Sequence, residues 1–149
     1  IGELANGGGL KLGPIEEMET RFPLLFEKHE FRKGSAGAGK YRGGYGVSLA
    51  LKLEIEEPAS AVAAGEGKHH APFGLFGGTA GLPHSYGRKP PGSSQIIDIA
   101  TKTVDLTFEP GEVLIIESAG GGGYGNSAER PAHLKALDEK SGLEQMVED

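Results

Sequence analysis

The sequence predicts a mainly β domain, either a sandwich or an open barrel, with long glycine-rich loops and a C-terminal α-helix. Residues 46–57, GVSLALKLEIEE, alternate apolar and polar side chains, which is the period of a half-buried strand. The 26 glycines and 9 prolines of the 149 residues lie in clusters between such segments, as expected for strands joined by sharply turning loops. Helix signals are confined to one short segment and the C-terminal region.

The N-terminal elements are expected to be a short helix followed by strands. Pro14 suits a first helical position, so IEEMETRF (15–22) predicts about two helical turns that stop at Pro23. LLFEKHEFR (24–32) looks extended. In the strand over 46–57, two faces are expected: Val47, Leu49, Leu51, Leu53 and Ile55 toward a core, and Ser48, Ala50, Lys52, Glu54 and Glu56 toward water.

The second half of the chain predicts loops, a hairpin and a helix. Residues 57–94 hold most of the remaining loop signals, and so long a structureless stretch is either functional or ordered by something outside it. QIIDI (95–99) and TVDLTF (103–108) predict strands. The turn at 109–112 has Pro and Gly where a type II turn favours them, so EVLIIES (112–118) completes a predicted hairpin. PAHLKALDEKSG (131–142) predicts a helix that places Leu134 and Leu137 on one side.

Composition excludes several classes of partner. The formal net charge is −6 and no run of Lys and Arg concentrates positive charge, so nucleic acid is not expected to bind. No apolar run approaches the ~18 residues of a membrane span, and no secretory signal is visible. The absence of cysteine excludes disulfides and thiolate metal sites. We expect a soluble, cytoplasmic protein that contacts neither nucleic acid nor membrane.

The first glycine cluster, GSAGAGKYRGGYG (34–46), begins with the spacing of a phosphate-binding loop. Such a loop requires Ser or Thr after the lysine to ligate magnesium, and a helix that starts there. Here Tyr41 follows Lys40, and three glycines in the next five residues oppose a helix. A nucleotide loop is therefore not predicted. Two interpretations stay open: a tight structural turn, or a turn that presents Lys40 and Arg42 to an anionic ligand or an acidic partner.

The second glycine cluster, GGGGYGNS (120–127), follows a predicted strand but lacks the G-x-G-x-x-G spacing of a dinucleotide site. It predicts either a structural turn or the lining of a ligand pocket. Tyr41, Tyr45 and Tyr124 lie among the glycines, where their rings can cover bare backbone. The candidate residues for contact with a ligand or another subunit are Lys40, Tyr41, Arg42, Gly43, Gly44, Gly121, Gly122, Gly123 and Tyr124.

No catalytic residue or metal site is predicted. His69 and His70 are adjacent, so on an extended chain their side chains point to opposite sides, and neither H-x-H nor H-E-x-x-H occurs near them, His84 or Asp98. The sequence has neither a G-x-S-x-G elbow nor a cysteine nucleophile. We therefore expect no self-contained active site.

Three phrases resemble motifs near the C-terminal end of the hydantoinase B family, in the same order: PIEEMETRFPLLFEKHEFRKGSAGAGKYRGGYG (14–46), APFGLFGGTAG (71–81) and FEPGEVLIIESAGGGGYGNSAERP (108–131). That family resembles one half of ATP-dependent hydantoinases and 5-oxoprolinases, and it includes subunits of biotin-independent ketone carboxylases. Two departures matter. The large N-terminal region with the family's metal-binding histidines and carboxylates has no counterpart in this sequence, and Asn126-Ser127 stand where the family more usually has Asp-Pro.

The resemblance implies that residues 1–149 form a single domain equivalent to the C-terminal region of hydantoinase B-like proteins, present as a separate small subunit or a cut piece. Larger hydantoinase A-like and hydantoinase B-like subunits would be its partners in a hetero-oligomer. ATP and a divalent metal would be bound by those partners and no cofactor by this chain.

The leading hypothesis is a small, non-catalytic subunit of an ATP-dependent, biotin-independent ketone carboxylase similar to acetophenone carboxylase. One alternative is a split or cut part of an ATP-dependent hydantoinase or 5-oxoprolinase. The other is a free-standing β-domain that binds a small anion or a partner protein through Lys40 and Arg42.

Overall fold

The computed structural model describes residues 13–143 and confirms the mainly β class with a C-terminal helix. The elements in chain order are α1 (Ile15–Arg21), β1 (Leu24–Phe31), β2 (Val47–Leu53), β3 (Ala59–Ala64), β4 (Ser85–Lys89), β5 (Ile97–Ile99), β6 (Lys102–Phe108), β7 (Val113–Glu117), a 3-10 turn η1 (Ser127–Glu129) and α2 (Ala132–Ser141). Within the described part, no helix is long and apolar enough to cross a bilayer.

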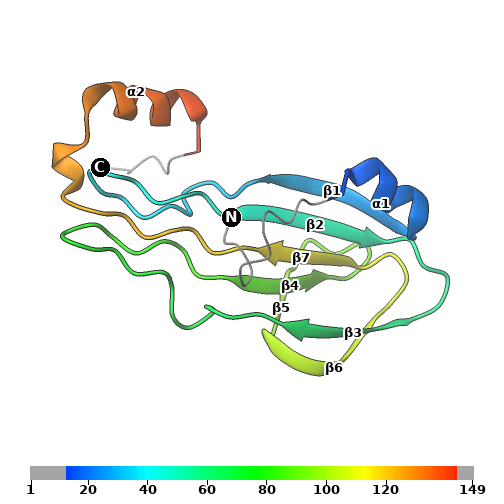
Figure 1. Ribbon diagram of the computed structural model, residues 1–149. Helices are drawn as coiled ribbons and strands as arrows, with labels where there is room; N and C mark the ends of the chain where they lie inside the picture. The colour runs from blue at the N-terminus through cyan, green and yellow to red at the C-terminus, as the bar shows by residue number, and fades with distance from the viewer. Residues whose placement is uncertain (1–12, 144–149) are drawn as a thin grey trace.

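The strands form two antiparallel layers that do not close into a barrel. The larger sheet has the order β1-β2-β7-β4-β5, and β3 pairs with β6 in a ribbon across one of its faces (Figure 1). Among the described residues only three large apolar side chains are buried, Ile99, Phe108 and Val113. An apolar cavity of about 120 Å³ lies between the layers. The core of this part of the protein is therefore small for its length.

Both predicted helices are confirmed. Each is preceded by a proline, which is the N-cap residue and not the first helical residue that the sequence predicted. Gly142 ends α2 with a φ of 65°, a left-handed conformation that glycine adopts without steric cost. On α2 Leu134 is half-buried, whereas Leu137 is exposed.

Residues 57–94 are mostly loop, as predicted, but the stretch is not structureless, because it also contains β3 and β4. The sequence of β3 is ASAVAA and that of β4 is SYGRK. Alanine and glycine have little preference for strands, and neither segment shows a clear apolar alternation. Pairing of β3 with β6, and of β4 with β7 and β5, makes these segments strands.

The prediction of a hairpin over residues 103–118 was wrong, although the predicted turn exists. Gly111 has a φ of 77°, and the Glu112 N–H donates to the Glu109 carbonyl over 3.1 Å. The two strands then separate, since β6 pairs with β3 while β7 pairs with β2 on one edge and β4 on the other. With both edges of β7 occupied, β6 has no edge to join, and it continues in the second layer.

The two faces predicted for β2 do not differ in burial as expected, since its residues other than Ser48 are all half-buried. Ser48 was assigned to the solvent face but is only 3% exposed. Its hydroxyl donates to the Glu117 carboxylate, which also pairs with Arg32 over 2.9 Å. Arg32 in turn donates to the carbonyls of Pro83 and Ser118. Ser48 is buried because this polar network covers the end of the sheet, where three glycine-rich segments leave it.

Candidate functional site

The three glycine-rich segments, residues 35–46, 72–83 and 119–125, extend from the same end of the large sheet and lie side by side (Figure 1). We call them the glycine-rich bundle. Its central segment is 119–125. Gly121 accepts a hydrogen bond from the Gly37 N–H over 2.8 Å and donates to the Gly44 carbonyl over 2.9 Å. Two residues further on, Gly123 accepts from Leu75 and donates to Thr79, each over 2.9 Å. The backbones of the three segments are thus joined directly.

Direct backbone contact explains most of the predicted glycine sites. A Cβ on Gly43, Gly122 or Gly123 would lie 1.9 to 2.0 Å from a backbone carbonyl oxygen of a neighbouring segment. A Cβ on Gly121 would lie 2.9 Å from a backbone nitrogen, whereas a Cβ on Gly44 would have no atom within 4 Å. As in the collagen triple helix, only glycine fits where backbones meet at this distance. Four of these five glycines therefore have a packing role.

Lys40 and Arg42 both pair with carboxylates. Lys40 Nζ lies 3.3 Å from Glu129 Oε2, and both side chains are exposed. Arg42 Nε donates to Asp138 of α2 over 3.1 Å, and its guanidinium carbon lies 3.9 Å from the centre of the Tyr45 ring. No helix follows Lys40, as expected from the glycines after it. The hydrogen bond from the charged Arg42 side chain to Asp138 helps to attach α2.

Asp138 is the centre of that attachment. Its carboxylate also accepts hydrogen bonds from Arg130 over 2.6 and 3.1 Å, and its side chain is only 12% exposed. Burial disfavours the charged form and would raise the pKa of Asp138. The hydrogen bonds from Arg130 and then Arg42 outweigh burial, so that its pKa is lowered below the ordinary 3.8. Asp138 stays ionised between two guanidinium groups and holds α2 against the bundle.

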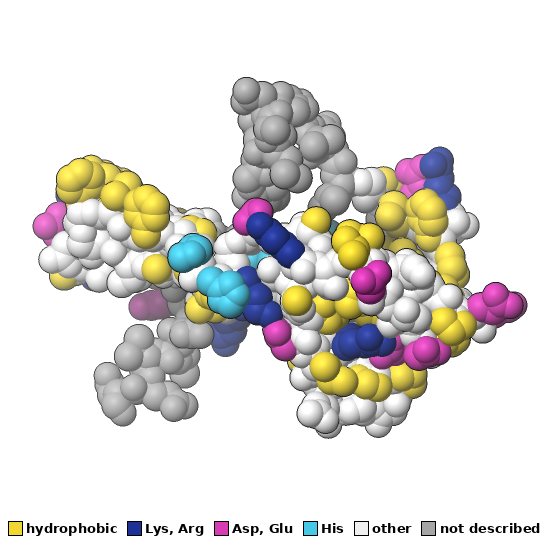
Figure 2. Space-filling view, turned by 90° about the horizontal axis from the view of Figure 1, so that it is seen from below, with side chains coloured by type: hydrophobic (Ala, Val, Ile, Leu, Met, Phe, Trp, Pro, Cys, Tyr) yellow, Lys and Arg dark blue, Asp and Glu magenta, His cyan; other side chains and the backbone are white. Residues whose placement is uncertain are grey.

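Apolar side chains gather at the far end of the bundle, as the hydrophobic surface on that end of the space-filling view shows (Figure 2). We call this group the aromatic tip: Tyr41, Phe73, Leu75, Phe76 and Tyr124. Tyr41 and Tyr124 exchange backbone hydrogen bonds of 2.9 and 2.8 Å, and the Phe76 ring lies 5.2 Å from that of Tyr124. All five side chains are exposed, Phe76 to 77% and Phe73 to 74%. Fixed backbones thus present apolar rings to the outside.

Phe76 has an unusual backbone conformation. Its φ is 50°, and among the described residues it is the one non-glycine residue with a positive φ. Gly77 follows with a φ of 94°, and the Gly78 N–H donates to the Leu75 carbonyl over 3.0 Å. Two central residues with positive φ are typical of a type I′ turn, which favours Asn and Gly and disfavours a bulky side chain. The turn holds the Phe76 ring outward at a cost in backbone strain.

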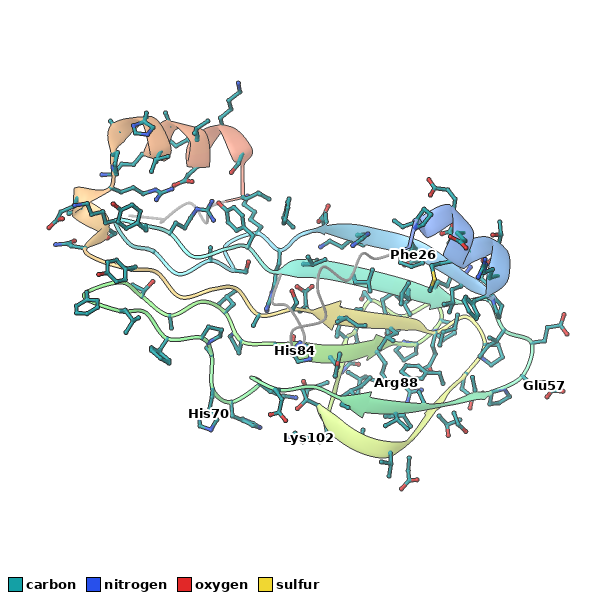
Figure 3. The ribbon with its side chains drawn as sticks, in the orientation of Figure 1. Phe26, Glu57, His70, His84, Arg88 and Lys102 are labelled. Carbon is teal, nitrogen blue, oxygen red and sulfur yellow. The ribbon has the colours of Figure 1, made fainter. Side chains whose placement is uncertain are left out.

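The adjacent histidines lie elsewhere. His69 and His70 line an open hollow of about 600 Å³ together with Lys68 and Lys102; Figure 3 labels His70 and Lys102. The lysines pair with Asp98 at 2.5 Å and Glu66 at 2.7 Å. Across residues 13–143, no three His, Cys, Asp or Glu side chains are grouped so that they could hold a metal ion. The described side chains therefore do not fit a divalent ion as a resident cofactor.

His84 lies near this hollow and has an unsatisfied nitrogen. Its Nε2 is buried and has no hydrogen-bond partner among residues 13–143, and its ring packs edge-on against Tyr86 at 4.4 Å. Burial, followed by the charges of Arg32 and Lys68, lowers the pKa of His84 below 6.5. The imidazole is therefore mainly neutral at pH 7.

The structure brings Tyr41 and Tyr124 of the predicted contacts together, and it adds residues that sequence reasoning missed. Phe73, Leu75 and Phe76 were not among the predicted contacts, and neither was Asp138. The segment APFGLFGG did indicate exposed apolar side chains, since its large apolar residues alternate with glycines, which have no side chain to cover them. Asp138 had no such signal because its two arginine partners come from other segments.

Comparisons with known proteins find relatives that are named as enzyme subunits and are much longer than this chain. The sequence profile of the family described as Hydantoinase B/oxoprolinase matches residues 4–127. The chain is 32% identical to the beta subunit of the caprolactamase of Pseudomonas jessenii, over 95% of its own length and 25% of that protein. It is 28% identical to the B subunit of a putative D-/L-hydantoinase of Pseudomonas sp. strain NS671, over 78% of this chain and 19% of the relative. The chain thus spans a quarter or less of the length of these relatives.

Two solved structures share its fold. The ATP-dependent caprolactamase of Pseudomonas jessenii has a TM-score of 0.74 at 30% identity, over 89% of this chain and 23% of the matched chain. A nucleotide-free acetone carboxylase also has a TM-score of 0.74, at 21% identity, over 90% of this chain and 22% of the matched one. Because the family profile covers most of the sequence, the chain belongs to the hydantoinase B/oxoprolinase family.

Proposed function

We propose that this chain is a structural, non-catalytic component of an ATP-dependent enzyme that opens cyclic amides. The observation that carries the structural role is the glycine-rich bundle, whose backbones are joined by direct hydrogen bonds and which ends in an exposed aromatic tip. Such an element suits a rigid projection between domains or subunits better than a substrate pocket. Lys40 and Arg42, the cations among the bundle's predicted contacts, both pair with carboxylates of the same chain.

The cyclic amide is proposed from the names of the relatives. Caprolactam and hydantoin contain a ring amide, and oxoproline, in the family description, does as well. The similarity to acetone carboxylase, at 21% identity, concerns the fold alone. The second candidate for the enzyme is therefore a ketone carboxylase of the acetophenone carboxylase type, which would not require biotin.

The other parts of the enzyme are expected to perform the chemistry. We propose that larger hydantoinase A-like and hydantoinase B-like subunits hold ATP and a divalent metal ion, which would activate a substrate oxygen by phosphorylation. Two relatives of this chain are themselves named as subunits, which supports a hetero-oligomer. This chain would then contribute to assembly and to the shape of the site.

The test is reconstitution of the complete complex with and without this chain. ATP consumption is measured with caprolactam, 5-oxoproline or hydantoin, and in parallel with acetone or acetophenone plus bicarbonate. Turnover of a cyclic amide that is lost without this chain and restored by adding it back is expected. Turnover of the ketones alone would favour the second candidate, and full activity without this chain would refute both.

A further inference from the structure

The aromatic tip presents an apolar surface without net charge. Its rings stand on backbones that are hydrogen-bonded to one another, so the backbone that carries them is held in place before any contact is made. Lys40, next to Tyr41 in the sequence, pairs with Glu129, so the two charges compensate each other. Large exposed aromatic side chains are typical of protein interfaces. A surface of this kind fits an apolar groove rather than a charged or nucleic-acid partner.

The backbone of Phe76 also argues for an external contact. Glycine or asparagine would satisfy a φ of 50° with less strain, yet this position carries a phenylalanine whose ring is 77% exposed. Within the described part, the ring lies 5.2 Å from the ring of Tyr124. Because most of its surface is uncovered, folding of residues 13–143 alone does not account for a large apolar side chain at this position.

The length of the relatives indicates which polypeptide covers the aromatic tip. In the matched proteins, the region equivalent to this chain is joined to three quarters or more of additional polypeptide. The described part has only three buried large apolar side chains, so much of its apolar surface is exposed. We propose that the aromatic tip docks into an apolar groove of this remaining portion of a hydantoinase B-type polypeptide. The proposal rests on the proposed function, since both require assembly with such a polypeptide.

Site-specific photocross-linking tests the proposal in the protein as its own cells produce it. Benzoylphenylalanine is placed at Phe76, and as a control at Val62 of β3, which is similarly exposed on the ribbon. After irradiation the complex is captured and the cross-linked peptides are identified by mass spectrometry. Cross-links from position 76, but not from position 62, to hydantoinase B-type sequence outside the part equivalent to this chain are expected.

A second variant separates docking from folding. Phe76→Gly removes the ring and relaxes the backbone, so the urea midpoint of the free chain is expected to stay equal or rise. Affinity for the hydantoinase B-type polypeptide should fall by about thirtyfold, as expected for the loss of a central aromatic anchor. Val62→Ser serves as the control and should leave that affinity unchanged.

The outcomes distinguish this inference from the proposed function. An intact complex in which position 76 gives no cross-link, or Phe76→Gly binds normally, overturns the docking site and leaves the proposed function standing. Cross-links from position 76 to a second copy of this chain overturn the choice of occupant. Failure to capture any hydantoinase-type polypeptide overturns both proposals.

Discussion

Gly43 and Gly44 are neighbours in sequence, yet we predict a large loss of stability when alanine replaces Gly43 and little or no loss when it replaces Gly44. A Cβ on Gly43 would lie 2.0 Å from the Gly121 carbonyl oxygen, where ordinary contact begins at 3.4 Å. A Cβ on Gly44 would meet no atom within 4 Å. The central segment must therefore move by more than 1 Å in Gly43→Ala and need not move in Gly44→Ala.

The cost of that movement follows from the hydrogen bonds of the central segment. Gly121 accepts from Gly37 and donates to Gly44, and a shift of this size lengthens both bonds beyond their useful range. A buried polar group left unsatisfied costs about 1–3 kcal/mol, so Gly43→Ala is expected to lose about 2–5 kcal/mol. Gly44→Ala should change stability by less than about 0.5 kcal/mol, or raise it slightly because alanine restricts the unfolded chain.

Urea unfolding of the purified chain measures the difference. With a slope of about 2 kcal/mol per molar urea, a loss of about 3 kcal/mol lowers the midpoint by about 1.5 M. Gly44→Ala should unfold at the wild-type midpoint or above it. Equal midpoints for the two variants would show that close backbone packing does not stabilise the bundle, and the reasoning would fail.

Three further substitutions test the polar contacts around the bundle and the sheet. Asp138→Asn removes the charge that two guanidinium groups share, so tryptic cleavage within α2 at pH 7 should accelerate by about tenfold or more; an unchanged rate would contradict this account. Glu112→Gln, at a side chain only 5% exposed that bonds Arg88, should lower stability by about 2–3 kcal/mol at neutral pH. Burial opposes the charge of Glu112, but the hydrogen bonds from Arg88 and a backbone N–H outweigh burial and lower the pKa of Glu112 below 4.5. The stabilisation that the ionised Glu112 contributes is therefore complete above pH 4.5 and disappears as the pH falls through the folded-state pKa. The variant should therefore lose less stability than the wild type on acidification, and parallel pH profiles would refute the assignment. Ser35→Ala, at a fully buried residue, leaves the Gly46 N–H without its partner and should cost about 1–3 kcal/mol by urea unfolding, with no change as the contrary result.

The sequence by itself determined the features that depend on local pattern. Alternation of apolar and polar residues identified β2, and proline and glycine at helix ends identified α1 and α2. The turn at 109–112 was predictable because its conformation requires glycine at one position. The order of the motifs also indicated the family before any fold was considered, as the match over residues 4–127 shows.

The tertiary structure alone decided how these elements combine. β3 and β4 are strands because segments distant in sequence pair with them. The sequence predicted that β6 pairs with β7, but it does not, because β2 and β4 occupy both edges of β7. The glycine clusters form one bundle through contacts between residues far apart in sequence, such as the Ala38 N–H and the Thr79 hydroxyl, 41 positions away. A local sequence pattern specifies which backbone conformations a segment can adopt. Which other segment it packs against depends on the backbone hydrogen-bonding groups and the space that the rest of the folded chain leaves available. For that reason the aromatic tip, whose residues come from all three segments, is visible only in the folded molecule.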